Sequence, residues 1–221
     1  MAMERADGHG TARRQGRGEG TRTAILAAAE QIFAKAGLAG ARTDAIAAAA
    51  GVNKALLYYY FKSKDALYRA VLEEQLTGFH VKALALLSQP GSAAQILLRY
   101  VGEHFDFIRA HPHYPRLFQR MMLAGDPRGE RLVAERMLPV AQKLSALLRR
   151  GMRDGELRDC DVLHAAISLV ALTVFYFNSA PIIRLVSGAE PFSPASMKKR
   201  KAEVLAFIRH ALVLQPEATA R

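Results

Sequence analysis

A glycine turn between two short helical segments constrains this chain more than any other feature. The first segment begins at Thr43, whose hydroxyl can cap a helix, and runs through an alanine-rich stretch to Gly51, which suits a left-handed helix end. Asn53 is a good N-cap for a second helix reaching Phe61, and Ser63 can cap a third. Two helices joined by so short a turn are predicted to form a helix-turn-helix.

The second of these helices carries side chains suited to contacting DNA. Lys54 lies in the first turn, where it opposes the helix dipole, and this placement is explained if the side chain reaches guanine or phosphate. Tyr58, Tyr59 and Tyr60 can donate hydroxyls to phosphates, and Lys64 begins the next helix, whose free N–H groups also attract phosphate. The alternative is that the tyrosines pack and the lysines are solvated. Three consecutive helical residues cannot all be buried on one side, so at least one tyrosine must face outward.

From about Thr21 to Val71 the sequence resembles the N-terminal domain of TetR/AcrR-family transcriptional regulators. The resemblance couples hydrophobic spacing, caps and turn residues: Ile25, Ala29, Phe33, Gly37, Thr43, Ile46, Ala47, Ala50, Gly51, Val52, Lys54, Leu57, Tyr58, Phe61, Ser63, Lys64 and Leu67. It implies that Leu57 and Phe61 are core residues. It also implies a DNA face made of Thr43, Lys54, Tyr58, Tyr59, Tyr60 and Lys64, with Ala55 at a base-contacting position. The family usually has Ser or Thr where this chain has Asn53, and often Gly where it has Ala55, so the operator sequence is not carried over.

Residues 1–20 are predicted to be a disordered basic arm, because they hold five glycines and several arginines but no large aliphatic residue beyond two methionines. A contact with DNA and an inert tail are equally open for this arm. The helix that follows has an apolar face at Ile25, Ala29, Ile32 and Ala36, and Gly37 is expected to end it. We therefore expect a DNA-binding domain over 21–70 and a larger domain over 71–215.

The larger domain is predicted to be helical throughout. Periodic apolar segments separated by Pro and Gly lie at about 64–88, 92–110, 113–124, 127–151, 160–178 and 195–214, and no alternating strand pattern appears. The predicted fold class is all-α with about nine helices: a three-helix helix-turn-helix domain followed by a domain for effector binding and dimerisation.

Two sets of residues in that domain are candidates for binding. Aromatic, methionine and polar residues on the middle helices can line an adaptable pocket for an apolar effector, or simply form core: His104, Phe105, Ile108, Tyr114, Phe118, Met121, Met122, Phe175 and Asn178. Broad apolar faces on the last two helices can pair with a second copy, as the resemblance implies, or close the monomer core: Ala165, Leu169, Leu172, Tyr176, Val204, Phe207, Ile208 and Ala211.

Composition narrows the function without deciding it. The net charge of +11 suits an anionic partner, although the excess is spread along the chain. The single cysteine, Cys160, excludes an intrachain disulfide and favours a reducing compartment, and no secretory leader or membrane span is evident, so a cytoplasmic protein without membrane contact is expected. No phosphate-binding glycine loop, oriented nucleophile or H-E-x-x-H motif occurs. Neither enzymatic activity nor a cofactor nor a metal is predicted.

The resemblance implies a transcriptional regulator, most simply a repressor that binds a palindromic double-stranded DNA operator as a homodimer and is released by an unknown small-molecule effector. Dimerisation is also expected because one small helix-turn-helix contacts too little DNA for useful affinity. Two alternatives from other classes stay open at this point. One is a sequence-nonspecific, architectural DNA-binding protein, and the other is a helical ligand-binding module without an operator.

Overall fold

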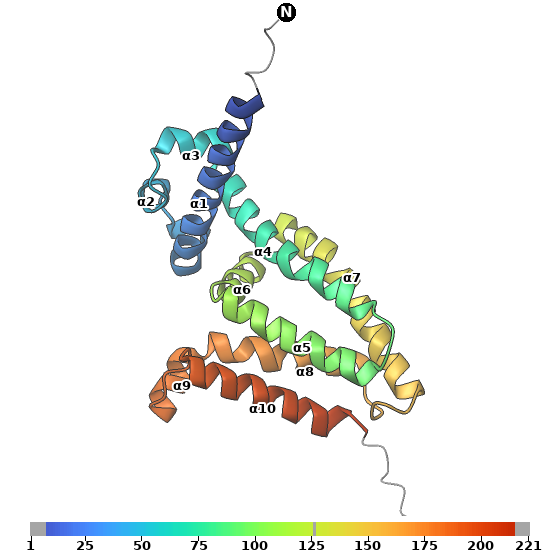
Figure 1. Ribbon diagram of the computed structural model, residues 1–221. Coiled ribbons are helices and arrows are strands. Elements are labelled where there is room, and N and C mark those ends of the chain that lie inside the picture. Colours follow the sequence, from blue (N-terminus) through green and yellow to red (C-terminus); the bar gives the residue numbers. More distant parts are fainter. Residues whose placement is uncertain (1–7, 126, 215–221) are drawn as a thin grey trace, which may run out of the picture. The chain divides into compact units, whose positions relative to one another are not determined.

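The computed structural model describes residues 8–125 and 127–214, which form helices joined by short turns (Figure 1). The all-α fold class predicted from the sequence is confirmed. Within the described residues, Leu157 and Val213 form an isolated antiparallel bridge, and no longer strand pairing occurs. The described part of the chain forms ten helices, where about nine were expected for the whole chain: α1 (Gly8–Gly40), α2 (Thr43–Ala49), α3 (Lys54–Phe61), α4 (Lys64–Leu87), α5 (Ala93–Ala110), α6 (Tyr114–Ala124), α7 (Pro127–Arg153), α8 (Val162–Asn178), α9 (Ala180–Ser187) and α10 (Pro194–Leu212).

The chain divides into two compact units, Met1–Glu74 and Gln75–Arg221, and the boundary falls inside α4. The first unit has a small core in which Ile25, Phe33, Ile46, Leu57 and Leu67 are all fully buried. These residues come from four helices, because each helix places one apolar face against the others. Burial of such large apolar side chains is the main force that holds so small a unit together.

Gly37 interrupts α1 as the sequence predicted. Its backbone angles, φ 68° and ψ −179°, are outside the helical region, and φ lies where glycine is favoured over other residues. The chain therefore turns after Ala36 and reaches α2 within six residues of Gly37.

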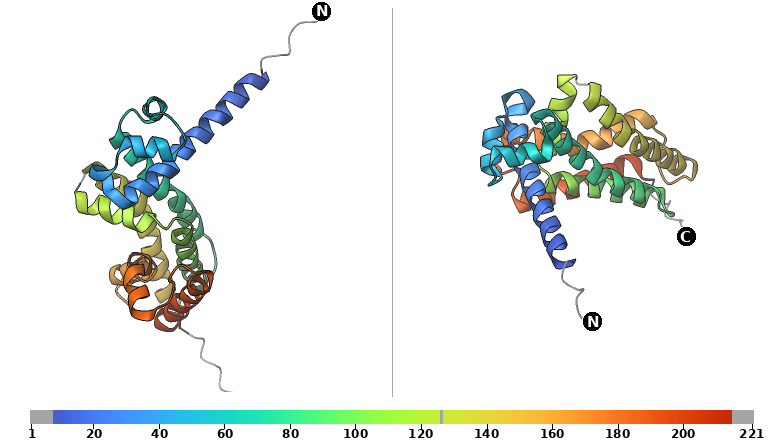
Figure 2. Two further views of the ribbon diagram at one scale, coloured as in Figure 1. Left: turned by 90° about the vertical axis from the view of Figure 1, so that its left-hand side faces the viewer. Right: turned by 90° about the horizontal axis from the view of Figure 1, so that it is seen from above.

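Residues 8–20, which the sequence predicted to belong to a disordered arm, form the first turns of α1 in the structure; residues 1–7 lie outside the described part. In Figure 2 these turns extend beyond α2 and α3. The physical reason is that a helix already nucleated by packing at Ile25 and Phe33 elongates at little cost, and Ala12, Arg13 and Arg14 are good helix formers.

The second unit is organised around α5, which packs against α7, α8 and α10. Its buried face includes Ile96, Leu97, Val101 and Phe105. The loop after α7 fixes the start of α5, because the Glu156 carboxylate accepts hydrogen bonds from the Ser92 hydroxyl and the Ala94 N–H. This arrangement leaves α8 and α10 side by side with one face of each outside the core (Figure 1).

The sequence analysis missed α9. It took Pro181 as the end of the apolar run, whereas Pro181 occupies the first turn of a new helix, where proline's missing N–H is no loss. Ile182, Leu185 and Val186 on this helix are more than 60% exposed. No single helix among the described residues is long and apolar enough to cross a membrane, although α8 and α9, bent by 69° at their junction, pass that test together by length and composition.

Candidate DNA-contacting surface and ligand pocket

The turn between α2 and α3 is built by caps that the sequence predicted. Gly51 has φ 66°, and the Asn53 side-chain oxygen accepts a hydrogen bond of 2.8 Å from the Leu56 N–H. The Ser63 hydroxyl accepts from the Ala66 N–H at 3.0 Å, which caps α4. The helix-turn-helix is therefore specified locally, residue by residue.

The predicted cap at Thr43 is wrong. Arg42 is the N-cap of α2, with extended backbone angles of φ −104° and ψ 128°, and no side chain caps this end. Thr43 is instead the first residue of α2. Its hydroxyl does not cap the helix and lies 3.4 Å from the Tyr58 hydroxyl on α3. The two candidate DNA-contacting hydroxyls are thus neighbours on one surface.

The three consecutive tyrosines of α3 have different surroundings. Leu57 and Phe61 are buried, as the resemblance implied, so the opposite side of α3 faces solvent. Tyr59 is 69% exposed and Tyr58 36% exposed. Tyr60 is half-buried and lies beside α1, where a Cβ at Gly18 would be 3.4 Å from its hydroxyl. The exposed surface of α3 is therefore formed by its first turn and by Tyr58 and Tyr59.

Lys54 and Ala55 are exposed in that first turn, and Lys54 pairs with Asp44 of α2 across 2.9 Å. The hydrogen bond to Lys54 holds the pKa of the Asp44 carboxyl below its usual value, and the same bond raises the pKa of Lys54. Both groups are in solvent, where such a pair contributes little to stability. The ammonium is therefore charged and able to exchange Asp44 for a phosphate.

Lys64 is placed differently from the other candidate residues. Its ammonium donates to the carbonyl oxygens of Ala39 and Ala41, at 3.4 and 3.2 Å, and the side chain is half-buried. These bonds hold the link between α1 and α2 onto the start of α4. An ammonium has three N–H donors, so one remains for another partner.

Two exposed cations beside this surface, Arg42 and Lys62, were not among the predicted residues. Lys62 ends α3 with φ 54° and ψ −39°, a region that residues with a side chain rarely occupy, and its ammonium lies 5.7 Å from the centre of the Tyr59 ring. A strained, non-glycine residue at this position is a hint of function. The sequence could have indicated both residues, because Arg42 directly precedes α2 and Lys62 directly follows α3 of the predicted helix-turn-helix.

Replacing Lys62 with glycine is expected to move stability and DNA affinity in opposite directions. Relief of the backbone strain should raise the free energy of unfolding by roughly 1 kcal/mol. Loss of the cation should weaken DNA binding and lower the slope of log K against log salt by about 0.9 for each phosphate contact removed. Denaturant titration and anisotropy across a salt series measure the two effects. Lys62→Ala is the control, because it removes the charge but keeps the strain; a gain in stability in that variant would contradict the explanation.

A cavity of about 120 Å³ lies inside the second unit. Its lining residues come from α4, α5, α6, α7 and α8: Leu76, Phe79, His80, Tyr100, His104, Tyr114, Pro115, Phe118, Arg136, Met137, Val140, Val170 and Val174. Of the predicted pocket residues, His104, Tyr114 and Phe118 line it.

The other predicted pocket residues lie elsewhere. Phe105, Ile108 and Met121 are buried core residues, and Met122 and Phe175 are 43% and 68% exposed. Asn178 is exposed as well. The sequence could not show which of these residues face a cavity, because aromatic and methionine side chains serve core, pocket and interface equally well.

His104 is a buried titratable group of the pocket. Burial lowers its pKa to about 4, so the imidazole is neutral at physiological pH. Its Nδ1 lies 2.9 Å from the oxygen of the Thr173 hydroxyl, and that hydroxyl donates its proton to the Val170 carbonyl oxygen at 2.8 Å. Burial likewise raises the pKa of Tyr114 to about 12 and raises that of Tyr100, so both phenols keep their protons.

The buried His104 predicts a loss of stability in acid. Its pKa is about 4 when folded and near 6.5 when unfolded, so between these values the unfolded chain binds more protons, and stability falls as pH falls from about 6.5 to 4. A shift of this size corresponds to roughly 3 kcal/mol. Denaturant titrations at pH 7 and pH 4.5 should show a smaller difference for His104→Gln than for the unchanged protein. Equal differences would contradict this account of His104.

The outer face of α8 and α10 differs from the predicted dimer face. Leu169, Val204 and Ile208 are buried in the monomer core, and Ala165, Leu172 and Tyr176 are half-buried; among the predicted residues only Phe207 and Ala211 are exposed. The exposed apolar residues of α8 are instead Leu163, Ile167, Ala171 and Phe175, a set we call the α8 stripe. Because α8 is apolar on nearly every side, its periodicity could not show which side faces the core.

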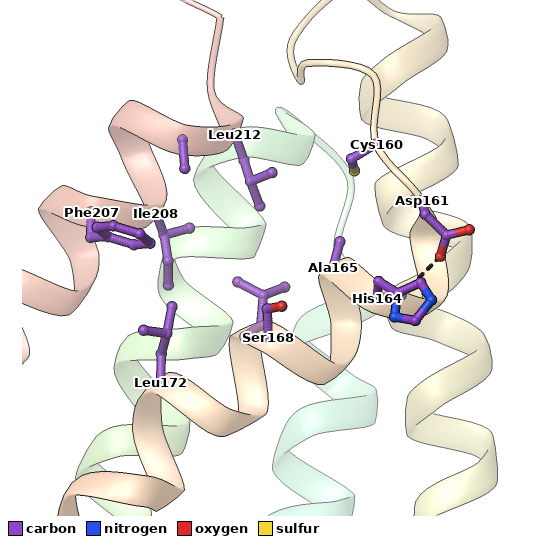
Figure 3. A pocket seen from close by; sticks show the side chains of 11 residues that line it. Cys160, Asp161, His164, Ala165, Ser168, Leu172, Phe207, Ile208 and Leu212 are labelled. Carbon is purple, nitrogen blue, oxygen red and sulfur yellow. Dashed lines mark hydrogen bonds between the residues drawn. The ribbon is translucent and has the colours of Figure 1, made fainter.

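A groove of about 320 Å³ lies between α8 and α10. Figure 3 shows Ser168 and Leu172 of α8 opposite Phe207 and Ile208 of α10, with Cys160 at one end. Burial and the adjacent carboxylates of Asp159 and Asp161 raise the pKa of the Cys160 thiol, so it is protonated at neutral pH. This environment does not generate a reactive thiolate.

Comparisons with known proteins agree with the geometry. The family described as "Bacterial regulatory proteins, tetR family" matches residues 25–71, and the family described as "YcdC-like protein, C-terminal region" matches residues 72–215. The HTH-type transcriptional regulator RutR of Escherichia coli K12 is 33% identical over 166 residues, which are 75% of this chain and 78% of that protein. The HTH-type transcriptional repressor NicS of Pseudomonas putida is 27% identical over 161 residues, covering 72% and 76%.

A solved structure, the putative transcriptional regulator SCO4942 from Streptomyces coelicolor, superposes with a TM-score of 0.65 at 30% identity and covers 86% of this chain and 97% of its own. Regulators of this kind bind DNA and small molecules and act as dimers. The helix-turn-helix surface, the second helical unit and these matches agree, and the chain belongs to the TetR family of bacterial transcriptional regulators.

Proposed function

We propose that this protein is a homodimeric repressor that binds a palindromic operator and leaves it when a small molecule occupies the second unit. The observation that carries the proposal is the organisation of α3. Its buried face, Leu57 and Phe61, fixes the helix to the unit, and its first turn presents Lys54 and Ala55 to solvent. Residues at the N-terminal end of such a helix are the ones that reach base edges in the major groove.

The proposed phosphate contacts surround that turn. Thr43, Tyr58 and Tyr59 offer hydroxyls, and Arg42 and Lys62 offer charges. Hydroxyl and cationic contacts of this kind position a protein on DNA without reading its sequence. In this proposal Lys64 acts mainly by holding the corner between α1 and α2, and Tyr60 by packing against α1.

The proposed dimer is formed by the α8 stripe together with Phe207 of α10. Single exposed apolar residues are common on protein surfaces. The stripe differs because its four residues lie in successive turns of one helix and form a continuous apolar face. The groove between α8 and α10 supports this assignment, since it offers space for a side chain of the second copy. A twofold dimer would match a palindromic operator with half-sites one or more helical turns apart.

Release by the effector is proposed to be a population shift. The ligand would bind better to dimers whose helix-turn-helix units are wrongly spaced for successive major grooves, and operator affinity would fall by the same factor as this preference. NicS, a repressor by its name, is consistent with repression as the regulatory sign.

Selection of duplexes from random DNA by the purified protein tests this function. A repressor of the proposed kind should enrich one palindrome, and footprinting should show two protected half-sites per dimer. In a reporter strain that carries the selected palindrome across a promoter, the protein should lower expression. Enrichment without any shared sequence would favour the architectural alternative, and raised expression would show that the protein is an activator.

A further inference from the structure

The cavity of the second unit contains polar atoms that the protein itself does not satisfy. The hydroxyls of Tyr100 and Tyr114 have no hydrogen-bond partner within residues 8–125 and 127–214, although the two side chains are 4% and 9% exposed. Neither hydroxyl oxygen is fully enclosed by protein atoms, so each is open to a partner in the cavity, where it can donate or accept a hydrogen bond. Two such groups on the wall of one cavity point to a molecule that completes their hydrogen bonds.

The neighbouring His104 provides the opposite hydrogen-bonding capacity. The Thr173 hydroxyl has one proton, which it donates to the Val170 carbonyl oxygen at 2.8 Å. Its oxygen can then accept from His104 Nδ1–H, 2.9 Å away. In a neutral imidazole whose proton is on Nδ1, Nε2 is an acceptor. His104 is 6% exposed and lines the cavity, and Nε2 has no partner among the described residues.

The size and the walls of the cavity restrict what can enter. Its volume, about 120 Å³, is near that of cavities known to hold a benzene ring, which are roughly 150 Å³. Phe79 packs beside Tyr100 and His104, with ring centres 5.8 and 4.8 Å apart, and Phe118 and Tyr114 form another aromatic pair at 6.1 Å. Flat aromatic walls around so small a space favour a planar ring.

We propose that the pocket binds a compact organic molecule with a single ring, which donates one hydrogen bond to His104 Nε2 and accepts one from the hydroxyl of Tyr100 or Tyr114. This inference rests on the proposed function, because it names the class of the effector. A pocket of this size excludes a long-chain or multi-ring ligand. Met137, also in the lining, is a flexible side chain that can adapt to substituents on the ring.

Three single-ring probes that differ in hydrogen-bonding groups test the hydrogen-bonding pattern. Benzamide has a donor and an acceptor, methyl benzoate has only the acceptor, and toluene has neither. In ligand-observed NMR titrations of the full-length protein, benzamide should bind about tenfold more tightly than methyl benzoate, and toluene should bind most weakly. Each step in this series removes one hydrogen bond between the probe and the protein. Equal binding of the three probes, or no binding of benzamide at millimolar concentration, would overturn the proposal.

Variants identify the groups on the protein. Tyr100→Phe and Tyr114→Phe each remove one hydroxyl and keep the ring, and one or both should reduce benzamide affinity about tenfold. His104→Leu should bring the affinity for benzamide close to that for methyl benzoate. Tyr176→Phe is the matched control, because the Tyr176 hydroxyl donates to the Pro191 carbonyl oxygen outside the cavity. Benzamide affinity unchanged in all three pocket variants would contradict the assignment.

Operator binding without ligand is measured on the same samples, so that the two proposals fail separately. Variants that bind the operator normally but show no preference among the probes would overturn the ligand class and leave the repressor proposal in place. The predicted preference without any operator would overturn the repressor proposal and leave the ligand class. Retained operator binding also shows that the pocket variants are folded.

Discussion

Replacing Ile167 with glutamate is expected to separate the proposed dimer into monomers and to reduce affinity for the proposed operator by roughly a hundredfold or more. Ile167 is 55% exposed in the middle of the α8 stripe, so the change should hardly disturb the monomer, whereas in a dimer it would bury an unpaired charge. Two linked DNA-binding units bind DNA about 10² to 10⁴ times more tightly than a single unit, and a monomer lacks this advantage. Sedimentation equilibrium and anisotropy on the operator measure both effects.

Val81→Glu is the matched control for this experiment. Val81 is 64% exposed on α4 and lies outside the α8 stripe, so the same chemical change there should leave both mass and affinity unaltered. A dimer that persists in Ile167→Glu with normal operator affinity would show that another surface joins the two copies. Monomers that still bind the operator tightly would show instead that dimerisation is not required.

Replacing Lys54 with alanine is expected to remove most sequence discrimination. A good base contact is worth about 1–3 kcal/mol, and the loss occurs in both half-sites of a dimer, so operator affinity should fall at least roughly thirtyfold. Affinity for unrelated DNA should fall much less, because the other cations near α3 remain. Tyr59→Ala should act in the same direction, since Tyr59 is the most exposed tyrosine of α3.

Two further variants show whether the expected loss of operator affinity depends on the position of Lys54 or only on its positive charge. Asp44→Asn removes the carboxylate that pairs with Lys54 at 2.9 Å, and it should strengthen DNA binding because Lys54 no longer has to leave a partner. Lys143→Ala on α7 removes another exposed lysine, one that belongs to the second unit, and should change little. If Lys54→Ala and Lys143→Ala weakened operator binding equally, only general charge would matter.

The fold could be predicted largely because its signals are local. Proline, glycine and capping residues marked the ends of most helices, and Asn53 and Ser63 cap the helices they were expected to cap. The resemblance covering Thr21 to Val71 was specific for the same reason, since it depends on caps and turn residues at fixed spacing. The Thr43 cap failed by a single residue, which is the usual uncertainty of a helix end.

What could not be predicted depends on tertiary packing. The continuation of α1 to Gly8 depends on the helix it joins, and α9 was hidden because Pro181 suits a helix start as well as a helix end. The choice between core, pocket and dimer face could not be made for α8, whose apolar residues surround the helix. Lys64 shows the same limit, because only the fold reveals the two carbonyl oxygens that its ammonium contacts.

We infer above all that this protein reads a DNA sequence. Fluorescence anisotropy of the purified protein with DNA from just upstream of its own reading frame, compared with a scrambled duplex of equal length across a salt series, tests it most directly. We expect tight binding to one duplex, either the upstream DNA or a palindrome selected from random DNA, at a salt concentration that abolishes binding to the scrambled duplex. If rising salt weakened binding to the scrambled duplex and to every upstream or selected duplex equally, sequence reading would be contradicted.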